Sequence, residues 1–331
     1  MKLIILVEKI RLSIGTAVHV GLEEGPRDPN FTTAFLMTFR EGKCDANCAF
    51  CPQARESSAA SDRLSRISWP EFTLSTVLDN WPPPGQFRRI CIQTICYPEV
   101  VDDVIEIVGR LRKISKLPIS VAIHPISKSD MGRLNDVGVS NIGIALDAST
   151  PSIFENIKGK NRDSHYRWES HHRAIDNALK IFGKGRVTTH LIVGLGESEY
   201  QAAQFIADMY QKDVTVGLFA FTNIKGTSLE NQPPPNLESY RRIQAVRQLV
   251  AKGKLLADQI KQDNNGHICL DIDQSLLREA LSSGEAFRVT GCKGCNRPFY
   301  NERPRGPMYN YPRDLTEEEI QKAIEETHLV G

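Results

Sequence analysis

Short apolar runs of β-type residues and stretches of helical periodicity alternate from one end of this chain to the other. Eight runs have the character of strands: 32–40, 87–93, 118–123, 141–147, 187–193, 216–222, 267–273 and 286–290. Such alternation predicts an α/β protein with a parallel sheet, and eight strand–helix repeats predict a (β/α)8 TIM-type barrel. A doubly wound open sheet is the alternative, but no GxGxxG sequence follows the first run.

Length and charge limit the kinds of protein this chain can be. The 331 residues suffice for one barrel with extensions, and we predict an N-terminal extension (1–30), the barrel (31–291) and a C-terminal strap and helix (292–331). The net charge of +1 lacks the basic excess of proteins that bind nucleic acid. The apolar run Leu3–Val7 is too short for a signal peptide, and no stretch approaches the ~20 apolar residues of a spanning helix. We expect a cytoplasmic protein that binds neither nucleic acid nor membrane.

Eight cysteines mark where the chemistry lies. In a cytoplasmic protein, closely spaced cysteines favour metal or redox chemistry over disulfides. Seven of the eight fall within or just beyond the end of a predicted strand, and Cys269 lies in the middle of one. Active sites of such barrels lie at the carboxyl ends of the strands. The cysteines are therefore expected to gather at the reactive end of the barrel.

The sequence CDANCAFC places Cys44, Cys48 and Cys51 in one tight loop after the first strand. Three thiolates can hold three corners of a 4Fe–4S cluster, which leaves the fourth iron open. That iron can chelate S-adenosylmethionine (SAM), and one electron then releases a 5′-deoxyadenosyl radical. The alternatives are a zinc site or buried thiols, but structural zinc is closed by four ligands, usually from two pairs. The lone triplet favours the cluster.

This loop resembles the cluster loop of the radical SAM superfamily, and the longer match CAFCPQ is closest to biotin-synthase-like proteins. The resemblance extends over most of the chain. In these proteins the aromatic residue before the third cysteine lies beside the adenine of SAM, which implies Phe50 as a cofactor contact. The radical would then carry out the chemistry, so no catalytic side chain is expected.

Two further strands resemble cofactor-binding strands of these proteins. NIGIALD resembles the strand whose acidic residue holds the ribose, which implies Asp147. HLIVGLGES resembles a motif that flanks the adenine, which implies Ile192 and Gly194, although a plain strand and turn would show the same residues. A basic residue on the helix after the fourth strand usually meets the methionine carboxylate, and Arg173 and Arg167 are the candidates.

The departures from biotin synthase are informative. Many radical SAM proteins carry a GGE-type motif after the second strand, whereas this chain has QTICYP. Biotin synthase holds a 2Fe–2S cluster through three cysteines and one arginine, and of these positions only Cys91 is kept. Val121 and Thr188 stand in place of two cysteines, and Cys269 in place of the arginine. We therefore do not expect that 2Fe–2S cluster here.

The remaining cysteines suggest another centre. Cys292 and Cys295 form a C-x2-C pair in GCKGC, which alone could be a redox dithiol or half of a zinc site. We predict a second 4Fe–4S cluster on this pair, with Cys96 as third ligand and Cys91 or Cys269 as a possible fourth. For Cys91 and Cys269, a role as small buried hydrophobes is an equal alternative.

The late segment GCKGCNRPFYNERPRGP resembles the archaeal two-component lipoyl synthases. That resemblance implies sulfur insertion at unactivated C–H positions of an octanoyl chain on a carrier-protein lysine, with the auxiliary cluster as sulfur donor. It implies as partners an octanoylated carrier protein or lipoyl domain, a second radical SAM subunit and an electron donor such as ferredoxin. Two alternatives stay open: a biotin-synthase-like radical enzyme acting on a small molecule, and a non-catalytic zinc or iron–sulfur protein.

Overall fold

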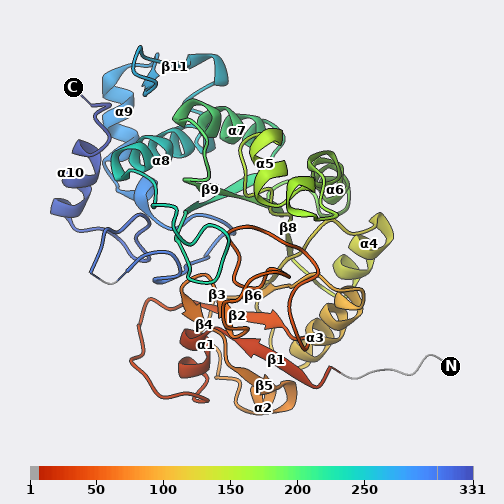
Figure 1. Ribbon diagram of the computed structural model, residues 1–331. Coiled ribbons are helices and arrows are strands. Elements are labelled where there is room, and N and C mark those ends of the chain that lie inside the picture. Colours follow the sequence, from red (N-terminus) through yellow and green to blue (C-terminus); the bar gives the residue numbers. More distant parts are fainter. Residues whose placement is uncertain (1–6, 304, 331) are drawn as a thin grey trace.

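A curved sheet of six parallel strands forms the centre of the protein (Figure 1). The computed structural model describes residues 7–303 and 305–330, so nearly all of the predicted apolar run Leu3–Val7 lies outside the described residues. The parallel strands follow one another in chain order: β2 (Thr33–Thr38), β6 (Arg89–Gln93), β7 (Ile119–Ala122), β8 (Asn141–Gly143), β9 (Val187–Val193) and β10 (Thr215–Ala220). At the β2 edge the sheet continues antiparallel through β1 (Lys9–Leu12) and β5 (Glu71–Thr73).

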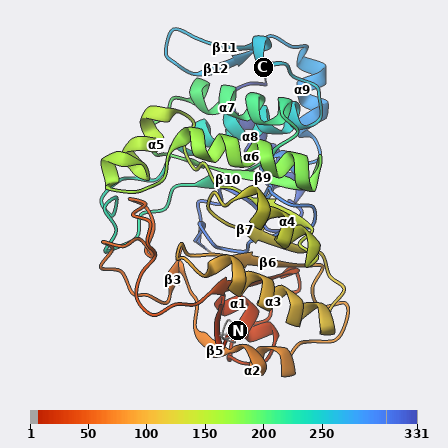
Figure 2. The same ribbon diagram turned by 90° about the vertical axis from the view of Figure 1, so that its right-hand side faces the viewer.

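Helices cover the outer face of the sheet (Figure 2). Between the strands lie α3 (Val100–Ile114), α4 (Lys128–Asp136), α5 (Pro151–Ile157), α6 (Trp168–Phe182) and α7 (Glu199–Gln211), and α8 (Leu237–Ala251) follows β10. The sequence marks their ends: Asp102 and Asp103 lie in the first turn of α3, and Ser198 forms a capping box with Gln201 at α7. No helix among the described residues is both long and apolar enough to span a membrane.

Smaller elements complete the described chain. The short helices are α1 (Ile14–His19), α2 (Leu74–Asp79), α9 (Gln274–Leu281) and α10 (Glu317–Glu325), with 3₁₀ turns at Lys160–Arg162, Ala257–Gln259 and Glu285–Phe287. Two antiparallel hairpins lie outside the central sheet: β3 (Arg63–Leu64) with β4 (Ile67–Ser68), and β11 (Ile260–Gln262) with β12 (Ile268–Leu270). Figure 2 shows the second hairpin at the opposite extreme of the molecule from β5 and α2.

The predicted α/β TIM-type class is confirmed, and six of the eight predicted strands form the parallel sheet. The predicted strand 267–273 instead forms β12, because the turn that begins at Asp263 folds it back onto β11. Asp263 Oδ1 accepts the N–H groups of Asn265 and His267, and Gly266 supplies a φ of +85°. The predicted strand 286–290 forms a 3₁₀ turn and one isolated bridge, from Arg288 to Tyr311.

An irregular segment, 290–301, runs between β10 and the start of β2, and from here on the name strap is kept for these residues alone. At β10, Leu218 N donates to Thr290 Oγ1 (2.8 Å), and Asn301 Nδ2 donates to Ala220 O (3.1 Å). At β2, Thr32 N donates to Asn296 Oδ1 (3.2 Å). The strap therefore closes the curve of the sheet with side-chain hydrogen bonds. The predicted division at residue 292 stays a prediction.

We predict that Asn296→Ala loosens this closure. The buried Asn296 amide bonds to backbone groups of Thr32, Asn30 and Pro312, and unsatisfied buried groups would remain after truncation. The free energy of unfolding should fall by ~1–3 kcal/mol, measured by urea denaturation. Asn265→Ala, in the exposed β11–β12 turn, is the control and should change it little. Equal losses in both variants would contradict the closing role of the strap.

Candidate active site

The loop after β2 brings the predicted cysteine triplet to the carboxyl end of the parallel strands. Hydrogen bonds fix its shape: Cys44 N donates to Gln53 O (2.9 Å), and Ala49 N donates to Ile157 O (2.7 Å) at the end of α5. The backbone N–H of Cys96, in the loop after β6, donates to Cys44 Sγ (3.0 Å). The loop is thus held by its own turns, by the loop after β6 and by the end of α5.

The donor set of this loop suits an iron–sulfur cluster. Burial, followed by repulsion from Cys44, raises the pKa of Cys51 to about 12, and burial also raises the pKa of Cys48. Protein groups alone therefore keep these thiols neutral, and only bound metal would hold them as thiolates. Within 7–303 and 305–330, no three His, Cys, Asp or Glu side chains are arranged to hold a single metal ion.

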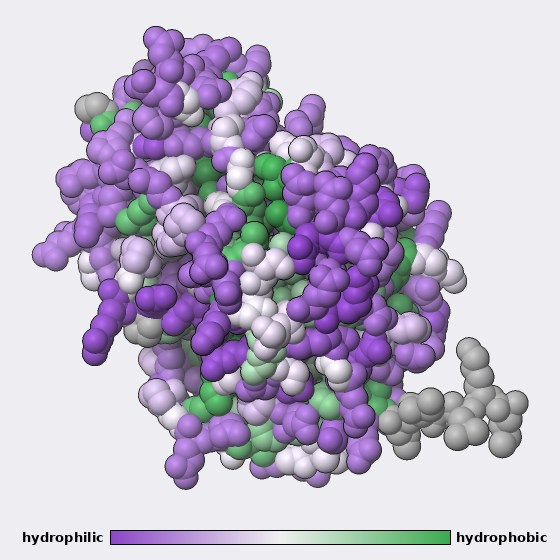
Figure 3. All heavy atoms as spheres, in the orientation of Figure 1, coloured by the Kyte–Doolittle hydropathy of each residue, from purple (hydrophilic) through white to green (hydrophobic). Residues whose placement is uncertain are grey.

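Of the triplet, Cys51 lines a cavity of about 200 Å³ inside the curved sheet, which we call the chamber. Side chains from all six parallel strands, the triplet loop and the strap line it, and most of them are apolar. Figure 3 shows less polar side chains gathered along the middle of this face, with hydrophilic side chains on both sides. The chamber is the natural place for a substrate next to the triplet.

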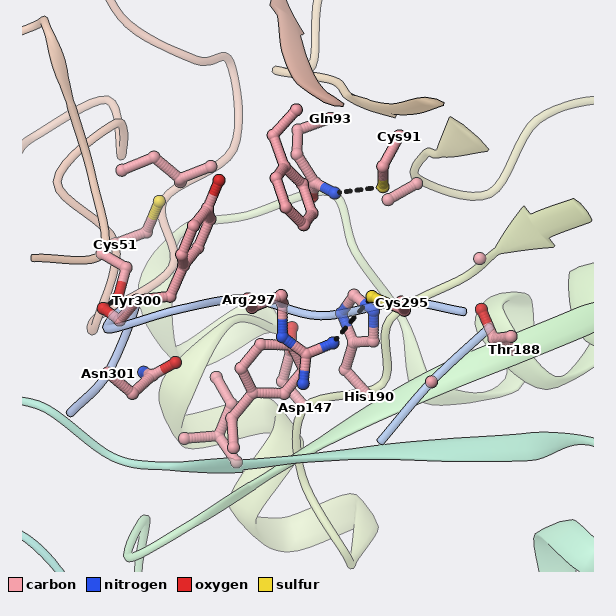
Figure 4. A pocket seen from close by; sticks show the side chains of 18 of the residues that line it. Cys51, Cys91, Gln93, Asp147, Thr188, His190, Cys295, Arg297, Tyr300 and Asn301 are labelled. Atoms are coloured by element: carbon pink, nitrogen blue, oxygen red, sulfur yellow. Dashed lines mark hydrogen bonds between the residues drawn. The ribbon is translucent and has the colours of Figure 1, made fainter. Parts of the chain in front are cut away.

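Three further cysteines line the chamber, and Figure 4 shows two of them, Cys91 and Cys295, on the opposite side from Cys51. Cys91 comes from β6, and Cys292 and Cys295 come from the strap. Burial raises the pKa of Cys91, and Cys295 and Cys292 raise it further, which places the three thiols within electrostatic reach of one another. We call them the second thiol group.

Polar side chains hold each member of the second thiol group. Gln93 Nε2 donates to Cys91 Sγ (3.1 Å), Ser120 Oγ to Cys292 Sγ (3.3 Å), and Arg297 Nη1 lies 3.7 Å from Cys295 Sγ. The guanidinium of Arg297 also stacks on Phe219, 4.0 Å from the ring centroid. Burial raises the pKa of Cys91 and of Cys295, and the hydrogen bond from Gln93 and the charge of Arg297 offset only part of that rise.

Two of the predicted auxiliary ligands lie elsewhere. Cys96 lies beside the triplet, where its thiol is 3.6 Å from His165 Nε2, and burial raises its pKa to about 11. It borders a shallow surface cleft rather than the chamber. Cys269 is exposed on β12, outside the central sheet. The structure therefore does not bring Cys96 or Cys269 to the C-x2-C pair, whereas Cys91 lines the same chamber as that pair. The second cluster itself stays a prediction.

Asp147 lines the chamber, as its predicted contact with the cofactor ribose requires. Its peptide continues the pairing of β8 with β9: Ile192 N donates to Asp147 O (2.9 Å), and the residue then turns with a φ of +63°. Its Oδ2 lies 2.6 Å from Lys158 Nζ in a buried ion pair. The ribose role stays a prediction, and Lys158 is a partner that the sequence did not reveal.

Of the other predicted cofactor contacts, some line the chamber and some do not. Phe50 and Ile192 line the chamber. Gly194 lies in a turn with a φ of +107°, where its N–H donates to Glu197 Oε1, so it has the turn role that was the alternative. Arg173 is exposed on α6 beside Ser170, and Arg167 bonds to carbonyls of its own loop. Neither arginine lines the chamber, and their contact with the methionine carboxylate stays a prediction.

Comparison with known proteins finds relatives among the biotin synthases and solved structures that share the fold. No family model matches the sequence. A biotin synthase from Prochlorococcus marinus (strain AS9601) is 25% identical over 304 residues, which cover 87% of this chain and 81% of that protein. A biotin synthase from Methylobacterium radiotolerans is 26% identical over 213 residues, covering 60% and 58% of the two chains.

Solved structures share the fold. The crystal structure of methylornithine synthase matches with a TM-score of 0.51 and 15% identity, covering 73% of this chain and 67% of that one. The FeFe-hydrogenase maturase HydG from Carboxydothermus hydrogenoformans matches with a TM-score of 0.52 and 16% identity, covering 90% and 67%. The solved structures support the α/β TIM-type fold, and the biotin synthases, with the triplet loop at the end of the first parallel strand, support a radical SAM enzyme. Among such enzymes this chain is biotin-synthase-like.

The first prediction from this site concerns the triplet. Replacing Cys44, Cys48 and Cys51 together by Ala should remove about four irons per chain and abolish 5′-deoxyadenosine formation, because three ligands of one cluster are lost. Iron analysis after anaerobic reconstitution and chromatographic detection of 5′-deoxyadenosine are the measurements. Cys269→Ala is the matched control and should keep both. Retained SAM cleavage in the triple variant would contradict the assignment of the cluster to these three cysteines.

The second concerns the Asp147–Lys158 pair. Lys158→Ala would leave a buried, uncompensated carboxylate and should lower the free energy of unfolding by ~3–5 kcal/mol, whereas adding Asp147→Ala should recover part of that loss.

Burial alone would lower the pKa of Lys158, but Asp147, Cys48 and Cys51 outweigh it and raise the pKa. The stabilisation is therefore present at neutral pH and lost as the pH rises above about 10.4 through the folded-state pKa. Urea denaturation across pH tests both points, and additive losses in the double variant would contradict the coupling.

Proposed function

We propose that this protein inserts sulfur at unactivated C–H positions of an acyl chain, and that the acyl chain is an octanoyl group on a carrier-protein lysine. The observation that carries the proposal is the position of the second thiol group. It shares one chamber with the triplet, so a substrate between them would lie within reach of both. A radical enzyme that only abstracts hydrogen has no need of the second group.

The residues fit two iron–sulfur centres with different tasks. The triplet would hold the cluster that binds SAM and supplies the electron for its cleavage to methionine and the 5′-deoxyadenosyl radical. Cys91, Cys292 and Cys295 would hold the sulfur donor. A cubane needs four ligands, and Ser120 Oγ, 3.3 Å from Cys292 Sγ, is an oxygen donor in hydrogen-bond contact with this group.

The protein's own contribution is positioning and exclusion of water. Phe50, Ile192 and Asp147 lie along the triplet side of the chamber, where SAM would bind. Apolar side chains such as Val121 and Phe221 line the space that remains, and they would shield a carbon radical from groups that could donate a hydrogen atom to it. Unactivated C–H bonds have no useful acidity, so acid–base catalysis by side chains could not break them.

A second candidate is sulfur insertion into a free small molecule. The biotin synthases that match this chain favour it, because their names describe a small-molecule product. The two candidates are separated by incubating reconstituted protein, SAM and a chemical reductant with an octanoyl-lysyl peptide or with free dethiobiotin. Thiolated peptide, identified by mass spectrometry, supports the carrier-bound substrate, and thiolated dethiobiotin supports the alternative.

The ligand set gives a sharper prediction. The wild-type protein should bind about eight irons per chain, and Cys91→Ala or Cys292→Ala should reduce this to about four. Both variants should still form 5′-deoxyadenosine but stop sulfur transfer, because only the donor is lost. Cys96→Ala is the discriminating variant and should keep the irons of the second centre. Four irons with tightly bound zinc and full sulfur transfer would refute the donor role.

A further inference from the structure

A cluster of cations lies around the chamber on three separate segments. We call Arg63, Arg66, Lys225, Arg303 and Arg305 the basic rim. Ser65, Ile224 and Asn301 line the chamber, and four members of the rim lie one or two residues away from one of them. Arg63, Lys225, Arg303 and Arg305 are exposed, and Arg66 is half-buried. The chamber therefore opens among positive side chains.

Hydrogen bonds join the three segments. Thr222 Oγ1, two residues before Ile224, donates to Asn301 O (3.0 Å). Ser65 Oγ donates to Tyr300 O (2.5 Å), and Arg66 N donates to the same carbonyl (3.3 Å). The β3–β4 hairpin and the loop after β10 are thus both fastened to the strap at residues 300–301. The basic rim is one fixed surface and not a set of independent side chains.

The charges of the basic rim are not compensated. None of its five members forms an ion pair with a carboxylate in 7–303 or 305–330. Burial and the nearby charge of Arg303 lower the pKa of Arg66, which shows that like charges lie close together. Glu302 acts in the opposite direction on the pKa of Arg66, but it is buried against Asn310, and burial raises its own pKa. Since the whole chain carries only +1, this excess is local.

We propose that the basic rim is the docking surface for the acidic face of a folded carrier domain, whose modified lysine enters the chamber. This inference rests on the proposed function. The cations are exposed and spread over three segments, so they do not form a pocket for a small anion. They would instead meet a broad negative surface, steer its approach and fix its orientation, while the acyl chain passes between them.

Affinity for an intact carrier tests the docking surface. The probe is a fluorescently labelled lipoyl domain of net negative charge with an octanoylated lysine, and fluorescence anisotropy gives its Kd with the reconstituted holoprotein. Lys225→Glu, Arg303→Glu and Arg305→Glu are combined in one rim variant. The Kd should rise about tenfold or more at about 50 mM NaCl, and the difference should shrink at about 500 mM. An unchanged Kd would overturn the proposal.

A matched control has the same change in charge at the other end of the strands. Lys113, Lys116 and Lys180 are exposed near the starts of β7 and β9, and together they are changed to Glu. The control should raise the Kd by less than about twofold, since these charges lie far from the docked domain. An equal effect of both triple variants would mean a response to net charge alone and would overturn the proposal. Iron content and the thermal midpoint check that both variants fold.

Kinetics separate this proposal from the proposed function. In the rim variant, kcat/KM for sulfur insertion should fall more for the carrier domain than for a short octanoyl-lysyl peptide, which has no acidic surface. Equal decreases in kcat/KM for the two substrates would overturn the docking proposal and leave the proposed function unaffected. If the wild type thiolates neither substrate but binds the carrier through the rim, the function fails and the docking stands. Tighter rim-dependent binding of an RNA oligonucleotide than of the carrier would also overturn it.

Discussion

The gap between β10 and β2 is the constraint on which the site depends. β10 is an edge strand of the sheet, and β1 pairs with β2 only over Leu36–Thr38, so buried backbone groups of β10 and at the start of β2 need other hydrogen-bond partners. The strap supplies them through Thr290, Asn296 and Asn301 instead of through further strands. Because the strap follows an irregular path inside the sheet, its two cysteines can face Cys91 on β6. A closed barrel of eight strands would have filled this space with layers of side chains.

The strap also sets the depth of the two thiol groups. Lys293 O accepts from Arg89, the first residue of β6, and Gly294 O accepts from Thr33, the first residue of β2. Asn301 instead bonds at Ala220, the last residue of β10. The strap therefore rises from the bottom of the strands to their carboxyl end. The second thiol group lies deep, and the triplet lies at the top, so a substrate must pass the triplet loop to reach both.

Features that depend on local sequence patterns could be predicted from the sequence. Six strands, the triplet loop and the chamber-lining residues Phe50, Asp147 and Ile192 follow from periodicity, spacing and resemblance. The other two strands were mispredicted because a short apolar run does not reveal its pairing partner, and the turn at Asp263 made one of them a local hairpin.

Spacing along the chain could not show which distant thiols meet. Cys91 and Gln93 are two residues apart, so they point to the same face of β6, and both line the chamber. Cys96 comes after the strand has ended, and its loop turns back to the triplet. Each thiol group also has a cation beside it, the buried Lys158 at the triplet and the half-buried Arg297 at the second group. Anionic centres need such charges when they are buried, and because Arg297 follows Cys295 by two residues on the strap, the element that delivers the thiols also delivers their counter-charge.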